Sequence, residues 1–129
     1  MRRLSQILLI VLRALIGFEV VLGIAFWTGH WYSLVSVHRT GGMLFVLTLW
    51  IIAALALAQR RNAGLAAFAI VWGLAIAGLG FSQQRILPGD LHWIVRVTHL
   101  VLAMAAMPIA ERLARKPSLS AAAPQVASN

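Results

Sequence analysis

Four histidines carry the metal-ligand chemistry open to this chain, because the sequence contains no cysteine. They are His30, His38, His92 and His99. The absence of thiols excludes iron–sulfur ligation, thiolate-bound metals and thiol catalysis. A site for metals that prefer oxygen ligands is not expected either, because the carboxylates Glu19 and Asp90 are too few and too far apart in the sequence. Imidazole is therefore the ligand type whose surroundings need to be considered.

His38 and His99 interrupt long apolar runs, where an ionisable residue is costly and indicates a function. Helix neighbours at three, four and seven residues share a face, and after His38 these positions hold Gly41, Gly42 and Phe45. After His99 the same face carries small residues, beginning with Ala103. Small residues beside a histidine on two facing helices leave a slot for a flat porphyrin, and histidine is a common axial ligand of haem iron.

The pattern thus predicts haem b bound between His38 and His99, with Gly41 and Gly42 forming the slot. Two other interpretations stay open: the glycines serve close helix packing, and the histidines are hydrogen-bonded core residues or a proton relay. If the second helix begins near Leu34, His38 lies about 6 Å along its span, against roughly 13 Å for His99. An earlier start would reduce this mismatch.

His92 is the alternative partner for His38, at a shallower level. It precedes Trp93, and His30 precedes Trp31, so both pairs also fit an interfacial aromatic belt. A second haem between His30 and His92 is a weaker alternative, because His30 falls in a connection.

Glu19 is a carboxylate well inside a predicted span, roughly 13 Å from Thr28. A buried carboxylate needs a proton or a partner. Glu19 could accept a hydrogen bond from His99, pair with Arg96, handle a proton as a catalytic residue, or pack in the neutral form. Arg39 and Arg96 lie near the same rim, where each could pair with haem propionates or extend to the membrane edge.

The surrounding sequence is that of a small membrane protein. Of its 129 residues, 61% are hydrophobic and only 11% are charged, against about a quarter charged in soluble domains. Spans of about 20 apolar residues are predicted at 4–27, 34–58, 63–81 and 91–109. The short connections force an all-α, up-down-up-down four-helix bundle over residues 1–112. Residues 113–129 are predicted to form a disordered tail.

Arginine and lysine predict the orientation. Eight of the eleven lie at the first end, in the second connection or after the fourth span, which places both termini in the cytoplasm. The net charge of +8 is spread in short clusters between apolar runs, so membrane lipid is the expected partner and nucleic acid is not.

Several short motifs resemble one half of haem A synthase. They are His38-Arg39 in the second span, His99-Leu-Val-Leu-Ala in the fourth, and Glu19-Val-Val-Leu-Gly followed by Thr28-Gly29. The similarity covers residues 7–112. In that family each four-helix half holds haem between histidines of its second and fourth helices on the outer side, so the resemblance implies His38 and His99 as axial ligands.

The chain departs from that family in three ways. It has four predicted spans instead of the usual eight, no cysteine pair, and Val35 where the catalytic half carries glutamate. We therefore expect a b-type cytochrome of a bacterial inner membrane that exchanges electrons with quinol or a larger redox complex. A haem-modifying enzyme and a cofactor-free accessory subunit are the alternatives. Reassembling the eight-helix architecture would require a homodimer or a larger partner.

Overall fold

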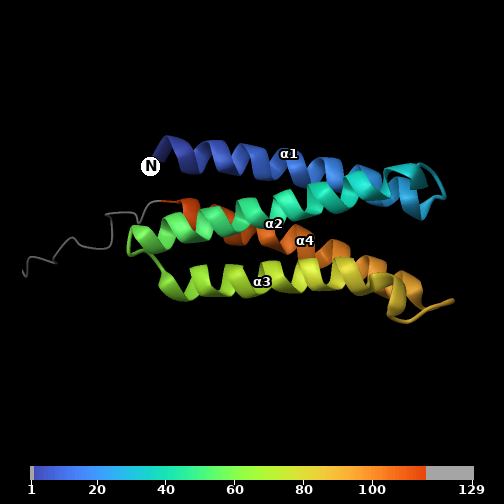
Figure 1. Ribbon diagram of the computed structural model, residues 1–129. Helices are drawn as coiled ribbons and strands as arrows, with labels where there is room; N and C mark the ends of the chain where they lie inside the picture. The colour runs from blue at the N-terminus through green and yellow to red at the C-terminus, as the bar shows by residue number, and fades with distance from the viewer. Residues whose placement is uncertain (1, 116–129) are drawn as a thin grey trace, which may run out of the picture.

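The computed structural model of the chain describes residues 2–115, and within them every regular element is helical. The α-helices are α1 (Arg2–Trp27), α2 (Val35–Ala58), α3 (Ala63–Ser82) and α4 (His92–Ala114), and the 3₁₀ turns are η1 (Tyr32–Leu34) and η2 (Gln83–Arg85). Successive helices run antiparallel, and α2 and α4 lie between α1 and α3 (Figure 1). The predicted all-α four-helix bundle is confirmed.

All four α-helices in residues 2–115 are long and apolar enough to cross a membrane. Their outward faces carry large apolar side chains that are more than half exposed, such as Ile10, Val71 and Val101. Such a surface is stable against lipid and would be costly against water. The fold is that of a multi-pass membrane protein.

The bundle has two unlike ends. The proximal end holds the start of α1, the 59–62 connection and the end of α4, while the distal end holds the connections 28–34 and 83–91 (Figure 1). At the proximal connection, Asn62 adopts a left-handed conformation and its side chain accepts a hydrogen bond from Leu65 N at 3.3 Å, which caps α3. Gly29 adopts φ +85° at the distal turn after α1, where a side chain would be strained.

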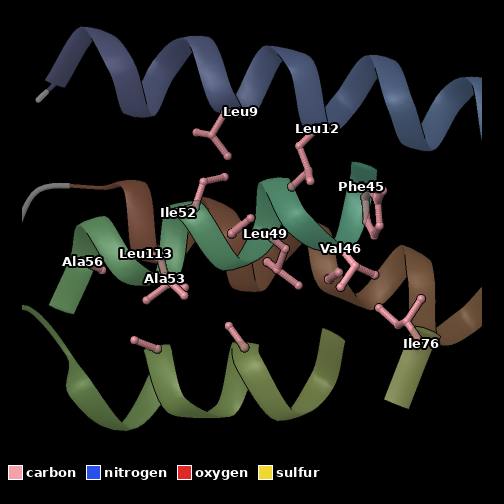
Figure 2. Packing of buried hydrophobic residues seen from close by; sticks show 14 of the residues in the cluster. Leu9, Leu12, Phe45, Val46, Leu49, Ile52, Ala53, Ala56, Ile76 and Leu113 are labelled. Carbon is pink, nitrogen blue, oxygen red and sulfur yellow. The ribbon is translucent and has the colours of Figure 1, made fainter. Parts of the chain in front are cut away.

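The proximal half is closely packed. Its buried cluster, the proximal core, consists of Leu9, Leu12, Ile16, Phe45, Val46, Leu49, Ile52, Ala53, Ala56, Ala66, Ala69, Ile76, Ala106, Ala110 and Leu113. In Figure 2, Leu9 and Leu12 of α1 point toward α2. Alanines on α2, α3 and α4 are almost fully buried, which lets these helix backbones approach closely.

Hydrogen bonds and one ion pair tie the helices together in the same half. Trp72 Nε1 of α3 donates to Leu102 O of α4 at 2.9 Å. Arg13 of α1 and Glu111 of α4 form an ion pair at 2.7 Å. This pairing gives the charge of Arg13 a partner although it lies within a predicted span.

α4 is longer than predicted. It continues through Pro108 and beyond the expected end near residue 109, because a membrane helix tolerates the loss of one backbone N–H donor when neighbouring helices pack around it. Leu113 is 3% exposed, so the packed bundle also extends past residue 112. The remainder of the predicted tail, residues 116–129, lies outside the described residues.

The proximal core predicts a contrast between two alanines of α3. Ala69 is fully buried and Ala67 is exposed. Ala69→Leu should lower the free energy of unfolding by about 1–3 kcal/mol, because extra methylenes must displace packed neighbours. Ala67→Leu should change it by less than about 0.5 kcal/mol. Denaturant titration in detergent micelles measures both, and equal effects would contradict the packing described.

Candidate functional site

The distal half contains a cavity of about 290 Å³ lined by residues from all four helices of the described chain. It begins where the proximal core ends, because Ile16, Phe45, Val46 and Ile76 belong to both. It reaches the distal surface, where the exposed Tyr32 contributes to its lining. Its polar and ionisable lining residues are Glu19, Tyr32, His38, Arg39, Gln83, Gln84, His92, Arg96 and His99.

His38 and His99 line this cavity together, from α2 and α4. Both also line a smaller cavity of about 70 Å³, whose lining residues all belong to the larger one as well. Counted from the start of each helical span, the two histidines lie at similar depths, because η1 begins the second span at Tyr32. Three residues of 3₁₀ helix and three of α-helix place His38 about 10 Å along that span. His99, seven residues into α4, is also about 10 Å along. The earlier start of the second span thus reduces the mismatch in depth that was expected from the sequence.

The ring nitrogens of the two histidines differ in their partners. Nδ1 of His38 lies 2.5 Å from Oε2 of Glu19, although the contact lacks hydrogen-bond alignment. Nδ1 of His99 is buried without a hydrogen-bond partner. Neither Nε2 atom has a hydrogen bond or ion pair within residues 2–115, and neither is fully buried. Each Nε2 therefore keeps a lone pair that it could donate to a metal, and that of His99 lies on the side of the ring that faces Gly80.

Glu19 contacts His38 and makes no ion pair with Arg96 or His99, the partners considered from the sequence. The carboxylate rests on Gly41, where a β-carbon would overlap Oε1 and lie 3.0 Å from Cδ. Gly41 therefore admits the Glu19 carboxylate. It is not among the residues that line the cavity, although the sequence analysis predicted that it would help to form the slot. Gly42 does line it. The sequence could not distinguish these two roles, because both glycines follow His38 on adjacent helix positions.

Sequence analysis missed a third glycine at the site. Gly80 of α3 packs against His99, and a β-carbon there would lie 3.1 Å from Cε1 of the imidazole. Gly80 and Phe81 also line the cavity. The sequence offered one signal for Gly80, which is a glycine after a run of small residues in the third span. Nothing in the sequence indicated which face of that span meets the fourth helix.

The two arginines that the sequence analysis considered as propionate partners lie at the cavity. Arg39 and Arg96 are exposed and line the cavity. The guanidinium of Arg39 lies 5.8 Å from the ring centroid of Phe81, a favourable cation–π distance. Within residues 2–115 neither arginine forms an ion pair with a carboxylate. Two unpaired cations at the edge of an apolar cavity favour a ligand with acidic groups at one edge.

The other two histidines are placed differently. His30 is exposed outside the cavity, and its Nδ1 lies 3.0 Å from Thr28 Oγ1. His92 lines the cavity at the first residue of α4, and its Nδ1 lies 3.3 Å from Ile86 O. The structure therefore does not bring His30 and His92 together in this cavity.

The donor set limits what the site can bind. In the part of the chain that the structure describes, no three histidine, cysteine or acidic side chains gather to hold a metal ion. Two imidazoles alone are too few for a bare transition metal, but they complete the coordination of an iron whose other ligands come from a porphyrin.

No protein-family model, curated protein or solved structure matches this chain. The function is therefore argued from these residues.

The contact between α3 and His99 predicts a local effect of Gly80→Ala. The added methyl group must displace the imidazole by a few tenths of an ångström, because its nearest ring atom is only 3.1 Å away. Gly78→Ala is the control on the same helix, since nothing lies within 4 Å of a β-carbon there. Imidazole NMR signals of His99 should move in the first variant and stay in place in the second. Unchanged signals in both would contradict this packing.

Proposed function

We propose that this chain is a membrane b-type cytochrome, which holds haem b between His38 and His99 and transfers electrons. The observation that carries the proposal is the pair of imidazoles, one from α2 and one from α4, which line one cavity with free Nε2 atoms. Bis-histidine ligation from facing helices is how helix bundles hold such a group.

The lining and the opening of the cavity suit this group. Its lining is mostly apolar, and its volume of about 290 Å³ is just below the range for ligand pockets, about 300–1,000 Å³. A ligand larger than the enclosed space has room at the distal surface, which the cavity reaches. The unpaired Arg39 and Arg96 lie at that cavity and would neutralise the two propionates.

When bound, haem supplies one-electron oxidation and reduction. The chain's own residues supply the conditions. His38 and His99 would ligate the iron and thereby stabilise a six-coordinate, low-spin centre. The apolar lining excludes water and lowers the local dielectric constant, and with the arginines it would set the potential. Glu19 contacts His38, one of the two proposed ligands. The catalytic role of Glu19 in handling a proton stays a prediction from the sequence.

The membrane and the partners form part of the proposal. Arginines concentrated at the proximal end support a cytoplasmic proximal end, with both termini inside and the haem near the outer face of a bacterial inner membrane. Quinol or a larger redox complex would exchange electrons at the distal rim. A homodimer would restore the eight-helix arrangement of the family that the sequence resembles.

Histidine substitutions test the proposal directly. The purified chain should show a low-spin b-type spectrum in oxidised and dithionite-reduced forms and a protohaem pyridine haemochrome. His38→Ala and His99→Ala should each abolish the low-spin spectrum, because each removes one axial ligand. His30→Ala should leave it intact, because His30 lies outside the cavity.

Three outcomes would contradict the ligand assignment or the function. Loss of the spectrum in His92→Ala but not in His99→Ala would move the ligand to His92. Conversion of bound haem to the formyl form would indicate a haem-modifying enzyme. A colourless protein from haem-replete cells would indicate an accessory subunit without a cofactor.

Cysteine labelling tests the orientation. The chain has no native cysteine, so a single introduced thiol has no background. Ser33→Cys in the distal connection should react with a membrane-impermeant maleimide on intact cells. Ala63→Cys at the proximal start of α3 should react only after permeabilisation. Both positions are exposed, so the reverse pattern would place the cavity on the cytoplasmic side.

A further inference from the structure

Oε2 of Glu19 and Nδ1 of His38 lie 2.5 Å apart, although their alignment is not that of a hydrogen bond. Two unprotonated acceptor atoms would repel each other at this distance, so the contact favours a proton on one of them. The Glu19 side chain is 8% exposed and that of His38 is 22% exposed, so other protein atoms cover most of the contact. Within the described chain, His38 is the only ion-pair partner of Glu19.

α1 holds the His38 ring at two points. Glu19 meets Nδ1, and Phe26 meets the ring edge-on, with centroids 5.3 Å apart and planes at 89°. Phe26 also stacks on Tyr32, with centroids 6.1 Å apart. These contacts fix the direction of the imidazole, so that Nε2 is the nitrogen left for the cavity.

Gly41 makes the Glu19 contact possible. A β-carbon at this position would occupy the place of the carboxylate oxygen Oε1. At Gly42 the equivalent atom would lie 3.9 Å from Oε2, an ordinary contact. The requirement for glycine beneath the carboxylate is therefore specific to position 41.

His99 has no comparable support. Its Nδ1 is buried without a partner, and its ring packs against Gly80. The two imidazoles are therefore unequal: one is held by a carboxylate, and the other by packing alone.

We propose that Glu19 is a positioning residue that holds His38 in its Nδ1–H tautomer, with Nε2 unprotonated toward the cavity, and that Gly41 is present to admit the carboxylate. This inference rests on the proposed function only where it concerns haem. A carboxylate on the far ring nitrogen fixes the tautomer and raises the basicity of the ligating nitrogen.

Removing the Glu19 carboxylate should weaken haem binding about 10- to 100-fold. It should also raise the reduction potential, because a less basic ligand stabilises ferric iron less.

The first test uses the chain without haem. In protein labelled with ¹⁵N-histidine and reconstituted in nanodiscs, His38 should show the Nδ1–H tautomer. Glu19→Ala and Gly41→Ala should give a mixture of tautomers, and Glu19→Gln should keep the Nδ1–H form, because its amide oxygen still accepts. A wild-type His38 protonated at Nε2 would overturn the proposal, since that proton would then occupy the ligating atom.

The second test uses haem titration and redox potentiometry. Glu19→Ala and Gly41→Ala should lose about 10- to 100-fold in haem affinity, and the haem that remains bound should have a more positive potential. Glu19→Gln should retain most of the affinity but share the shift in potential, because the charge is lost and the acceptor is kept. Two controls should match the wild type: Gly17→Ala, with nothing within 4 Å of its β-carbon, and Glu111→Gln, which removes a proximal carboxylate.

The two proposals fail in distinguishable ways. If the wild type takes up no haem, the cytochrome proposal fails, and the tautomer of His38 still decides the role of Glu19. If the wild type binds haem but Glu19→Ala and Gly41→Ala match both controls in affinity, potential and tautomer, the positioning role is refuted and the cytochrome proposal stands. Folded yield of each variant is measured by circular dichroism. Glu19→Gln, nearly isosteric with the native residue, keeps the test decisive if Gly41→Ala does not fold.

Discussion

A carboxylate and two imidazoles inside a bundle of lipid-spanning helices need partners, because neither lipid nor apolar side chains can solvate them. The chain places the Glu19 carboxylate against Nδ1 of His38, and the close approach of α1 to α2 at Gly41 makes room for this contact. The buried Nδ1 of His99 has neither such a contact nor a hydrogen-bond partner. The distal half is therefore organised around side chains that a purely structural bundle would not contain.

The division of the bundle into a packed half and a hollow half gives this arrangement its rigidity. Alanines and leucines fill the proximal core, while aromatic, glycine and ionisable residues surround the distal cavity. Well-packed interiors deform little, so the proximal core fixes the spacing of α2 and α4 where they present His38 and His99. A bound group would then meet ligands that are already in place, which lowers the entropic cost of binding.

Sequence reasoning found the four spans, because the hydrophobic run and the charged boundary are local properties of the chain. It also selected His38 and His99, because an ionisable residue in an apolar run stands out. It could not assign Glu19 to His38, find Gly80 beside His99 or separate Gly41 from Gly42, because these depend on helix rotation and on the 3₁₀ turn at Tyr32. It also placed the end of the fourth span too early, near residue 109, whereas α4 continues through Pro108 to Ala114 because tertiary packing tolerates the proline.

We propose that one iron porphyrin is ligated by two imidazoles in the distal cavity. Near-infrared magnetic circular dichroism of the oxidised, purified chain, with haem and protein quantified in the same sample, identifies the axial ligands. Ligation by His38 and His99 should give a bis-imidazole charge-transfer band with one haem per chain. A histidine–methionine band would contradict it, since Met43 also lines the cavity, as would a high-spin centre or a preparation that contains no haem.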